Sequence, residues 1–232
     1  MLQRTLIPAI LLWCSFSACN SNSTEDRQPP DYIPPQCTQL LWVQVLHPSD
    51  TVGQLVCFER MDAEWHSKDT FRVSIGRNGL AAAEGSQQQL TLKSVKQEGD
   101  GCSPAGLFPL LFVFGYAPSI ATQMEYRTMQ EDDICVDDLF SADYNQHVSA
   151  LASRNNSHEK MRRKDEQYKL GIWVGYNAEP VVPGNGSCIF LHIWKKENAP
   201  TSGCTAMAEE DMMTILQWLD KDAHPYLLQT TP

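Results

Sequence analysis

The chain has 232 residues and a mass of 26.1 kDa, and its 28 acidic against 18 basic residues give a formal net charge of −10. Phosphate binding relies on clustered Lys and Arg, and no basic run here is longer than residues 161–164, so we expect no nucleic-acid partner. With 42% hydrophobic and 20% charged residues and a mean hydropathy of −0.34, the composition is typical of a soluble globular protein with one sizeable core.

Residues 1–18 have the pattern of a signal peptide. Arg4 precedes an apolar stretch at residues 6–16, which is shorter than the roughly 20 residues that span a bilayer. The sequence Phe-Ser-Ala-Cys at its end resembles the lipobox of bacterial lipoproteins and predicts lipidation of Cys19, with plain export as the alternative. Asn20 favours an outer-membrane lipoprotein. We therefore expect an exported protein of the periplasm or cell envelope, with membrane anchorage through Cys19.

Residues 19–37 are polar and contain four prolines, at positions 29, 30, 34 and 35. Such a segment cannot bury enough apolar surface to fold, so we interpret it as the anchor cysteine followed by a disordered, extended linker. A single folded domain is then predicted over residues 38–226, followed by a short tail at residues 227–232.

Most local signals after residue 38 predict β-strands. Apolar and β-branched runs at residues 39–46 and 53–60 flank a turn-type cluster and predict a hairpin. The middle of the chain, residues 98–156, is rich in turn residues and has no clear period. Three more strands are predicted, at residues 71–75, 172–176 and 188–194.

One helix is well indicated near the C-terminus. Apolar residues between positions 212 and 219 recur at the spacing of one helix face, and residues 209–211 place acids in the first turn, where the helix dipole favours them. A second, weaker helix is predicted at residues 157–167, which are charged on most faces. The predicted fold class is therefore mainly β, a β-rich sandwich-like domain with a C-terminal helix.

Export would place the cysteines where disulfides persist. One of the eight lies in the predicted signal peptide and Cys19 is the predicted lipid acceptor, which leaves six, with fifteen possible pairings into three bridges. We do not expect three bridges, because Cys57 and Cys188 fall within apolar strands, where a free thiol packs as a small hydrophobe. Cys102 and Cys135, both in the turn-rich middle, are the candidate pair.

Two neighbouring segments combine a histidine with a cysteine. The period of two in the last predicted strand puts His192 on the same face as Phe190 and Trp194. Cys204 follows in a turn of small residues just ahead of the predicted helix, where the dipole and free backbone N–H groups favour a thiolate. If the intervening loop folds back, His192 can take the thiol proton. From spacing alone, a core histidine and a structural cysteine remain the commoner interpretation.

The same two segments resemble the catalytic domain of L,D-transpeptidases of the YkuD type. Phe-Leu-His-Ile-Trp stands at residues 190–194 and Gly-Cys-Thr-Ala-Met at residues 203–207, a pairing found in one branch of that family. Several further motifs occur upstream in one order, so the likeness extends from about Leu40 to Pro225. They lie at residues 76–80, 98–101, 104–106, 114–117, 135–138, 144–145 and 175–177.

The resemblance implies peptidoglycan chemistry, with stem peptides as partners. Cys204 would be the nucleophile and His192 the general base, and Ser202 and Gly203 would line the oxyanion site. In this family the cysteine attacks the carbonyl that joins the third stem residue to a terminal D-alanine, and an amine or water resolves the thioester. The resemblance implies no metal and no other cofactor. We expect the protein to be a monomer.

Four residues in the shared motifs are candidate substrate-binding residues: Asp100, Gly101, Tyr116 and Trp194. The Gly-Asp-Gly sequence around Asp100 is equally the signature of a tight turn. The adjacent acids at residues 137–138 are interpreted as solvated loop side chains rather than as an acid/base pair.

The chain departs from better-known family members at the position of an arginine that could meet a substrate carboxylate. Those members carry this arginine shortly after the cysteine, whereas here residues 206–207 are Ala-Met, and Ile193 replaces the glycine that follows their histidine. Recognition of the carboxylate must then come from another group, and the candidates are Arg77, Lys96 and Arg127.

Three functional hypotheses remain open at this point. The first is an exported L,D-transpeptidase. The second is a hydrolase with the same Cys204 and His192 pair, acting as an L,D-carboxypeptidase or as an amidase-type enzyme. The third is a non-enzymatic wall-binding lipoprotein that keeps the fold without the chemistry.

Overall fold

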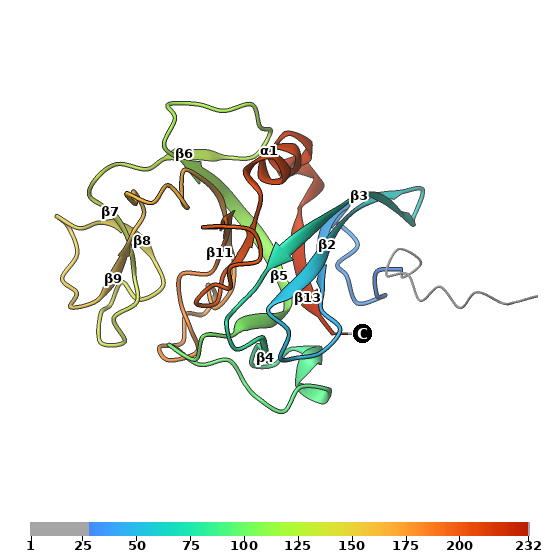
Figure 1. The fold of residues 1–232 in the computed structure, drawn as a ribbon, viewed down its shortest axis with the longest axis horizontal. Helices are drawn as coiled ribbons and strands as arrows, with labels where there is room; N and C mark the ends of the chain where they lie inside the picture. The colour runs from blue at the N-terminus through green and yellow to red at the C-terminus, as the bar shows by residue number, and fades with distance from the viewer. Residues whose placement is uncertain (1–27, 232) are drawn as a thin grey trace, which may run out of the picture.

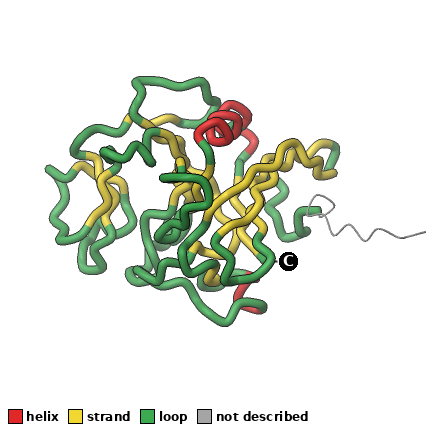
Figure 2. The backbone as a smooth tube through the Cα atoms, in the orientation of Figure 1, coloured by secondary structure: helices red, strands yellow, loops and turns green. Residues whose placement is uncertain are grey.

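The computed structural model describes residues 28–231, so the predicted signal peptide and the predicted lipidation site at Cys19 lie outside the described residues. Figure 1 shows the order and arrangement of the elements, and Figure 2 shows that strands and loops make up most of the fold. The strands are β1 (Gln39–Gln44), β2 (Val52–Met61), β3 (Glu64–Ser74), β4 (Leu80–Ala82), β5 (Ser103–Gly115), β6 (Tyr126–Thr128), β7 (Asp133–Val136), β8 (His147–Ser149), β9 (His158–Lys160), β10 (Leu170–Val174), β11 (Phe190–Ile193), β12 (Thr205–Met207) and β13 (Tyr226–Thr230). The described helices are α1 (Glu209–Trp218) and the short 3-10 segments η2 (Gln87–Leu90) and η3 (Lys221–Ala223).

The main sheet has ten strands and closes on itself. Its order runs β10-β11-β12-β3-β2-β1-β13-β5-β4. The strand at the start of this order, β10, also pairs with β5 near its end, and this pairing closes the sheet. The predicted hairpin is formed by β1 and β2, which pair antiparallel. Helix α1 buries Met212, Ile215 and Leu216 in the core that the sheet encloses. The mainly β fold with a C-terminal helix is confirmed. Within residues 28–231, no helix is long and apolar enough to cross a membrane.

A separate three-stranded sheet, in the order β8-β7-β9, stands beside the main sheet (Figure 1). A disulfide between Cys135 on β7 and Cys188, two residues before β11, ties the two sheets together. The predictions of a free thiol at Cys188 and of a Cys102–Cys135 pair are therefore wrong. Cys188 lies outside β11 and has a positive φ of 54°. The direction of its side chain therefore does not follow the alternation of side chains along the strand, on which the prediction relied. Cys57 is a buried free thiol, as predicted.

Two other assignments in the middle of the chain differ from expectation. The predicted helix at residues 157–167 is absent, and β9 and turns take its place. This segment has no apolar stripe that a helix could bury, so a helix there would gain little from packing. The turn-rich middle contains β5, a long strand whose residues Pro104, Gly106 and Pro109 are poor strand formers and hide its pattern.

Both ends of the domain are more ordered than predicted. The described part of the predicted linker packs on the sheet, where Ile33 and Cys37 share a buried cluster with Phe58 and Leu228. Residues 227–230 are not a tail, because they belong to β13, which lies between β1 and β5 and pairs with both. A strand inside a sheet satisfies its backbone groups and buries its side chains, which local composition does not reveal.

Loss of the disulfide should weaken the fold. The substitution Cys135→Ser is expected to lower the free energy of unfolding by roughly 2 to 4 kcal/mol, because the bond joins positions 53 residues apart and restricts the unfolded chain. Urea unfolding monitored by tryptophan fluorescence measures the change. Cys102→Ser alters a free thiol and is the matched control, expected to change stability by less than about 0.5 kcal/mol. A larger loss in Cys102→Ser than in Cys135→Ser would contradict the connectivity described here.

Candidate active site

Parallel pairing of β11 with β12 brings the histidine and the cysteine to one face of the sheet. His192 lies opposite Ala206 and Leu191 opposite Thr205, so the register puts Cys204 beside Phe190. Paired residues of neighbouring strands point to the same side, and successive residues alternate. The alternate face carries Leu191 and its neighbours into the main core. His192 and Cys204 therefore share the face that is directed away from that core.

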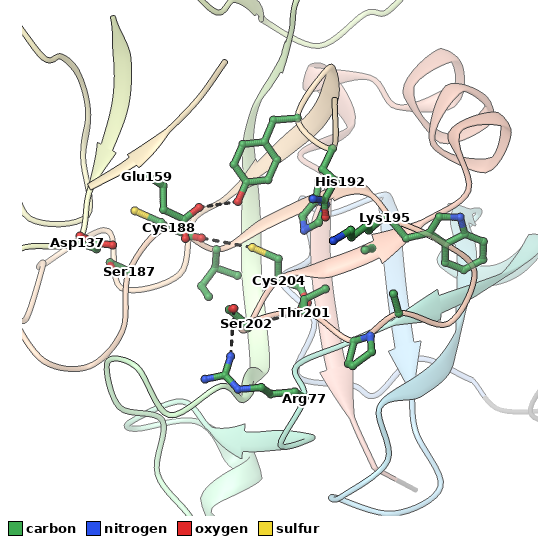
Figure 3. Close-up of a pocket in the computed structure, with 18 of the residues that line it drawn as sticks. Arg77, Asp137, Glu159, Ser187, Cys188, His192, Lys195, Thr201, Ser202 and Cys204 are labelled. Carbon is green, nitrogen blue, oxygen red and sulfur yellow. Dashed lines mark hydrogen bonds between the residues drawn. The ribbon is translucent and has the colours of Figure 1, made fainter. Parts of the chain in front are cut away.

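Both side chains line a cavity of about 510 Å³ (Figure 3). Cys204 is 7% exposed and His192 is 5% exposed, so each is largely enclosed while contributing to the cavity wall. The further lining residues that matter to the chemistry are Arg77, Lys96, Glu98, Asp137, Glu159, Arg163, Tyr168, Trp194, Lys195, Ser202 and Gly203. Cys204 and His192 therefore stand in the wall of one cavity together with charged and aromatic side chains.

The tautomer of His192 follows from its hydrogen bond. Nδ1 lies 2.8 Å from the carbonyl oxygen of Ile193, and a carbonyl only accepts, so Nδ1 carries the proton and Nε2 keeps a lone pair. The Tyr168 ring packs edge-to-face with the imidazole at a centroid distance of 5.1 Å. Burial lowers the pKa of His192 to about 4. At neutral pH the ring is thus a neutral proton acceptor.

Cys204 rests as a neutral thiol. Its sulfur accepts a hydrogen bond from the Phe190 N–H at 3.3 Å and donates to the Cys188 carbonyl at 3.4 Å. Burial raises the pKa of the Cys204 thiol above its ordinary range, and the nearby Glu159 carboxylate adds to the shift. The raised pKa of the thiol disfavours the thiolate that the turn and the helix dipole were expected to favour. One reason is that β12 separates Cys204 from α1, which begins only after its N-cap at Ala208, beyond effective reach of the dipole.

The turn before Cys204 is held by side chains. Thr201 Oγ1 accepts from the Gly203 N–H at 3.1 Å and donates to the Cys204 carbonyl at 2.6 Å. A Cβ at position 203 would come within 3.0 Å of the Cys102 carbonyl oxygen, which explains the glycine there. Ser202 accepts from Arg77 Nη1 at 3.1 Å. The Gly203 N–H predicted for the oxyanion site is thus already engaged by Thr201.

Of the predicted substrate-binding residues, Trp194 lines the cavity, whereas Asp100, Gly101 and Tyr116 stand behind its wall. Asp100 holds the lining residue Lys96 in an ion pair at 2.7 Å. Gly101 lies against a guanidinium, since a Cβ there would approach the Arg77 Cζ to 2.8 Å. The Tyr116 hydroxyl accepts from the Arg163 N–H at 2.7 Å.

The three candidates for carboxylate recognition differ in position. Arg77 lines the cavity beside Ser202. Lys96 also lines it but is only 3% exposed and is committed to Asp100. Arg127 lies outside the lining, with its guanidinium 3.7 Å from the centroid of the Phe112 ring. Of these three candidates, Arg77 is the best placed to meet a substrate.

Several lining residues were not found from the sequence. Glu159 lies in the segment that was expected to be helical, and Tyr168 lies just after it, where no motif was recognised. The two side chains meet only once β9 and β10 have formed. The acids at residues 137–138 are not both solvated: Asp137 lines the cavity, and Asp138 is 7% exposed and accepts from the Phe140 and Asn156 N–H groups. Among the described residues, no three His, Cys, Asp or Glu side chains form a group that could hold a metal ion.

Comparison with known proteins agrees with this geometry. The family model of the L,D-transpeptidase catalytic domain, YkuD, matches residues 59–225, a range that contains the whole lining of the cavity. The chain belongs to this L,D-transpeptidase family. Membership supports an acyltransferase activity of the L,D-transpeptidase type, directed at peptidoglycan stem peptides, at the level of the family. A search of curated proteins found no match.

The buried neutral imidazole should affect the acid stability of this L,D-transpeptidase domain. As pH falls through 6.5 the unfolded chain binds a proton at His192, whereas the folded chain does so only near pH 4, so stability is lost across that window. The loss is on the order of 3 kcal/mol. His192→Gln should remove this component. Urea unfolding at pH 7 and pH 4.5 measures it, with His66→Gln at an exposed position as the control. Equal acid losses in parent and His192→Gln would contradict the depressed pKa.

Proposed function

We propose that the protein is an exported peptidoglycan L,D-transpeptidase that uses Cys204 as nucleophile and His192 as general base. The observation that carries the proposal is the placement of both side chains on one sheet face and in one cavity, inside a domain of the L,D-transpeptidase family. Export is supported by the signal-like residues 1–18, and an envelope location by the lipobox-like sequence that ends at Cys19.

The first half-reaction is acylation. A bound stem peptide displaces the thiol from the Cys188 carbonyl, and the thiol proton moves to His192 Nε2 as sulfur attacks the carbonyl carbon before the terminal D-alanine. The C–S bond forms, the C–N bond to D-alanine breaks, and the imidazolium returns the proton to the leaving amine. Since both groups are neutral at rest, the thiolate arises only during attack.

The second half-reaction decides between transfer and hydrolysis. An amine from a neighbouring stem that attacks the thioester carbonyl gives a cross-link, and water gives a shortened stem. In both cases the C–S bond breaks and the Cys204 thiol is restored. The same pair therefore supports an L,D-carboxypeptidase outcome, and the ratio of products measures which activity dominates.

The decisive experiment compares the mature domain with its Cys204→Ala variant on purified tetrapeptide muropeptides. The parent should form a thioester at Cys204, seen by intact-mass spectrometry, and should release D-alanine. Cys204→Ala should lose turnover by at least about 10³-fold. Cys102→Ser removes another free thiol and should behave as the parent. Equal turnover in parent and Cys204→Ala would exclude the nucleophile, and a protein that binds muropeptides without turnover would favour the wall-binding alternative.

Arg77 is proposed to bind the substrate carboxylate beside the Ser202 hydroxyl. Arg77→Gln should raise KM for the tetrapeptide donor about tenfold and change kcat much less, because the lost contact is made in the bound substrate as well as in the transition state. Steady-state kinetics of D-alanine release measures both constants. Arg127→Gln removes a cation outside the cavity lining and is the matched control. A KM shift of the same size in both variants would contradict the assignment.

A further inference from the structure

Glu159 is a carboxylate of the cavity wall that the acylation step does not use. It sits at the middle of β9 opposite Cys135, the cysteine whose disulfide ties the small sheet to the residues before β11. Paired residues point to the same side, so Glu159 shares the inward direction of Cys135. In the view of Figure 3, the Cys204 sulfur lies between Glu159 and His192.

Tyr168 fixes the Glu159 side chain and connects it to the histidine. Its hydroxyl donates to Glu159 Oε2 at 2.5 Å, and its ring packs against His192 and Phe190 at centroid distances of 5.1 and 5.5 Å. The tyrosine is only 4% exposed, so its ring is packed among these neighbours. A carboxylate offers about four lone-pair sites, and one tyrosine donor leaves room for a further donor from the cavity.

The chemistry of transfer needs a second proton acceptor, whereas hydrolysis does not. An alkylammonium acceptor must lose one proton before it can attack the thioester and a second when the C–N bond has formed. His192 is a single base and takes one of them. Water gives up one proton only. A second base in the same cavity wall would therefore act in aminolysis and be dispensable for hydrolysis.

We propose that Glu159 binds the ammonium group of the acceptor and takes up its first proton. In that step R–NH3⁺ and the Glu159 carboxylate become R–NH2 and the carboxylic acid, and the free amine then attacks the Cys204 thioester. The C–N bond forms and the C–S bond breaks, the second proton passes through His192 to the departing Cys204 sulfur and restores the thiol, and Glu159 returns its proton to solvent. This inference rests on the proposed function and names the group that directs the enzyme toward primary amines.

The surroundings of Glu159 suit this role. Burial raises the pKa of its carboxyl, and the neighbouring acids Asp137 and Glu98 add to the rise, whereas Tyr168 and Arg163 oppose it. A carboxylate with a raised pKa is a better proton acceptor near neutral pH than an ordinary one. Arg163 is held by Asp165, its bidentate partner at 2.6 and 2.9 Å, which limits its competition for Glu159.

The test measures how the thioester partitions in parent and Glu159→Gln proteins. Both proteins receive the same tetrapeptide donor and one of two nucleophiles. The first is an acceptor peptide that carries a primary alkylammonium group, and the second is hydroxylamine, which is uncharged at neutral pH. Glu159→Gln should form the thioester at a rate within about threefold of the parent and lose transfer to the alkylammonium by at least about tenfold relative to hydrolysis. Transfer to hydroxylamine should be retained, since that nucleophile brings one proton fewer.

Two further variants and the parent itself separate the outcomes. Glu131→Gln, a change at an exposed carboxylate paired with Arg162, should partition as the parent does. Glu159→Asp keeps the carboxyl group and should retain part of the transfer activity. This variant also tests the role of the carboxylate if Glu159→Gln does not fold. Equal partitioning in parent and Glu159→Gln, or equal losses with both nucleophiles, would overturn the role of Glu159. Absence of a thioester in the parent would overturn the proposed function and this inference with it.

Discussion

The parallel pairing of β11 with β12 is the interaction on which the site depends. These strands are short, and their register alone decides that His192 and Cys204 point into the same cavity. A slip of one residue would turn one of the two side chains into the main core. The alternate residues of both strands, among them Leu191, Ile193 and Met207, are buried under α1 and the sheet, so the hydrophobic core itself holds the register.

Burial then sets the resting protonation state. The enclosed site keeps the imidazole and the thiol neutral, in contrast to a preformed ion pair. A thiol that donates to the Cys188 carbonyl is protected until a substrate displaces it. The disulfide at Cys188 supports this carbonyl and also anchors the small sheet that carries Glu159. One covalent bond therefore organises the part of the cavity wall that carries Glu159.

The success and failure of sequence reasoning follow the range of the interactions involved. The β1–β2 hairpin and α1 were predicted correctly, since their patterns arise from residues close in sequence. The Cys135–Cys188 bond, the course of β13 and the inward direction of Glu159 involve partners far apart in the chain. The charged segment at residues 157–167 was expected to be helical but contains β9. Its sequence carried no sign that the Glu159 carboxylate would line a cavity, because the other walls of that cavity come from distant segments.

The sequence by itself determined the family, the mainly β class, and the histidine strand and cysteine turn, because these depend on local motifs and on the period of a single strand. Only the tertiary structure decided which groups surround them. It placed Arg77 beside Ser202, put Asp100 and Tyr116 behind the cavity wall, and brought Tyr168 and Glu159 into the same wall as Cys204. The physical reason is that a cavity is lined by distant segments, and its dielectric and charge exist only once they have packed together.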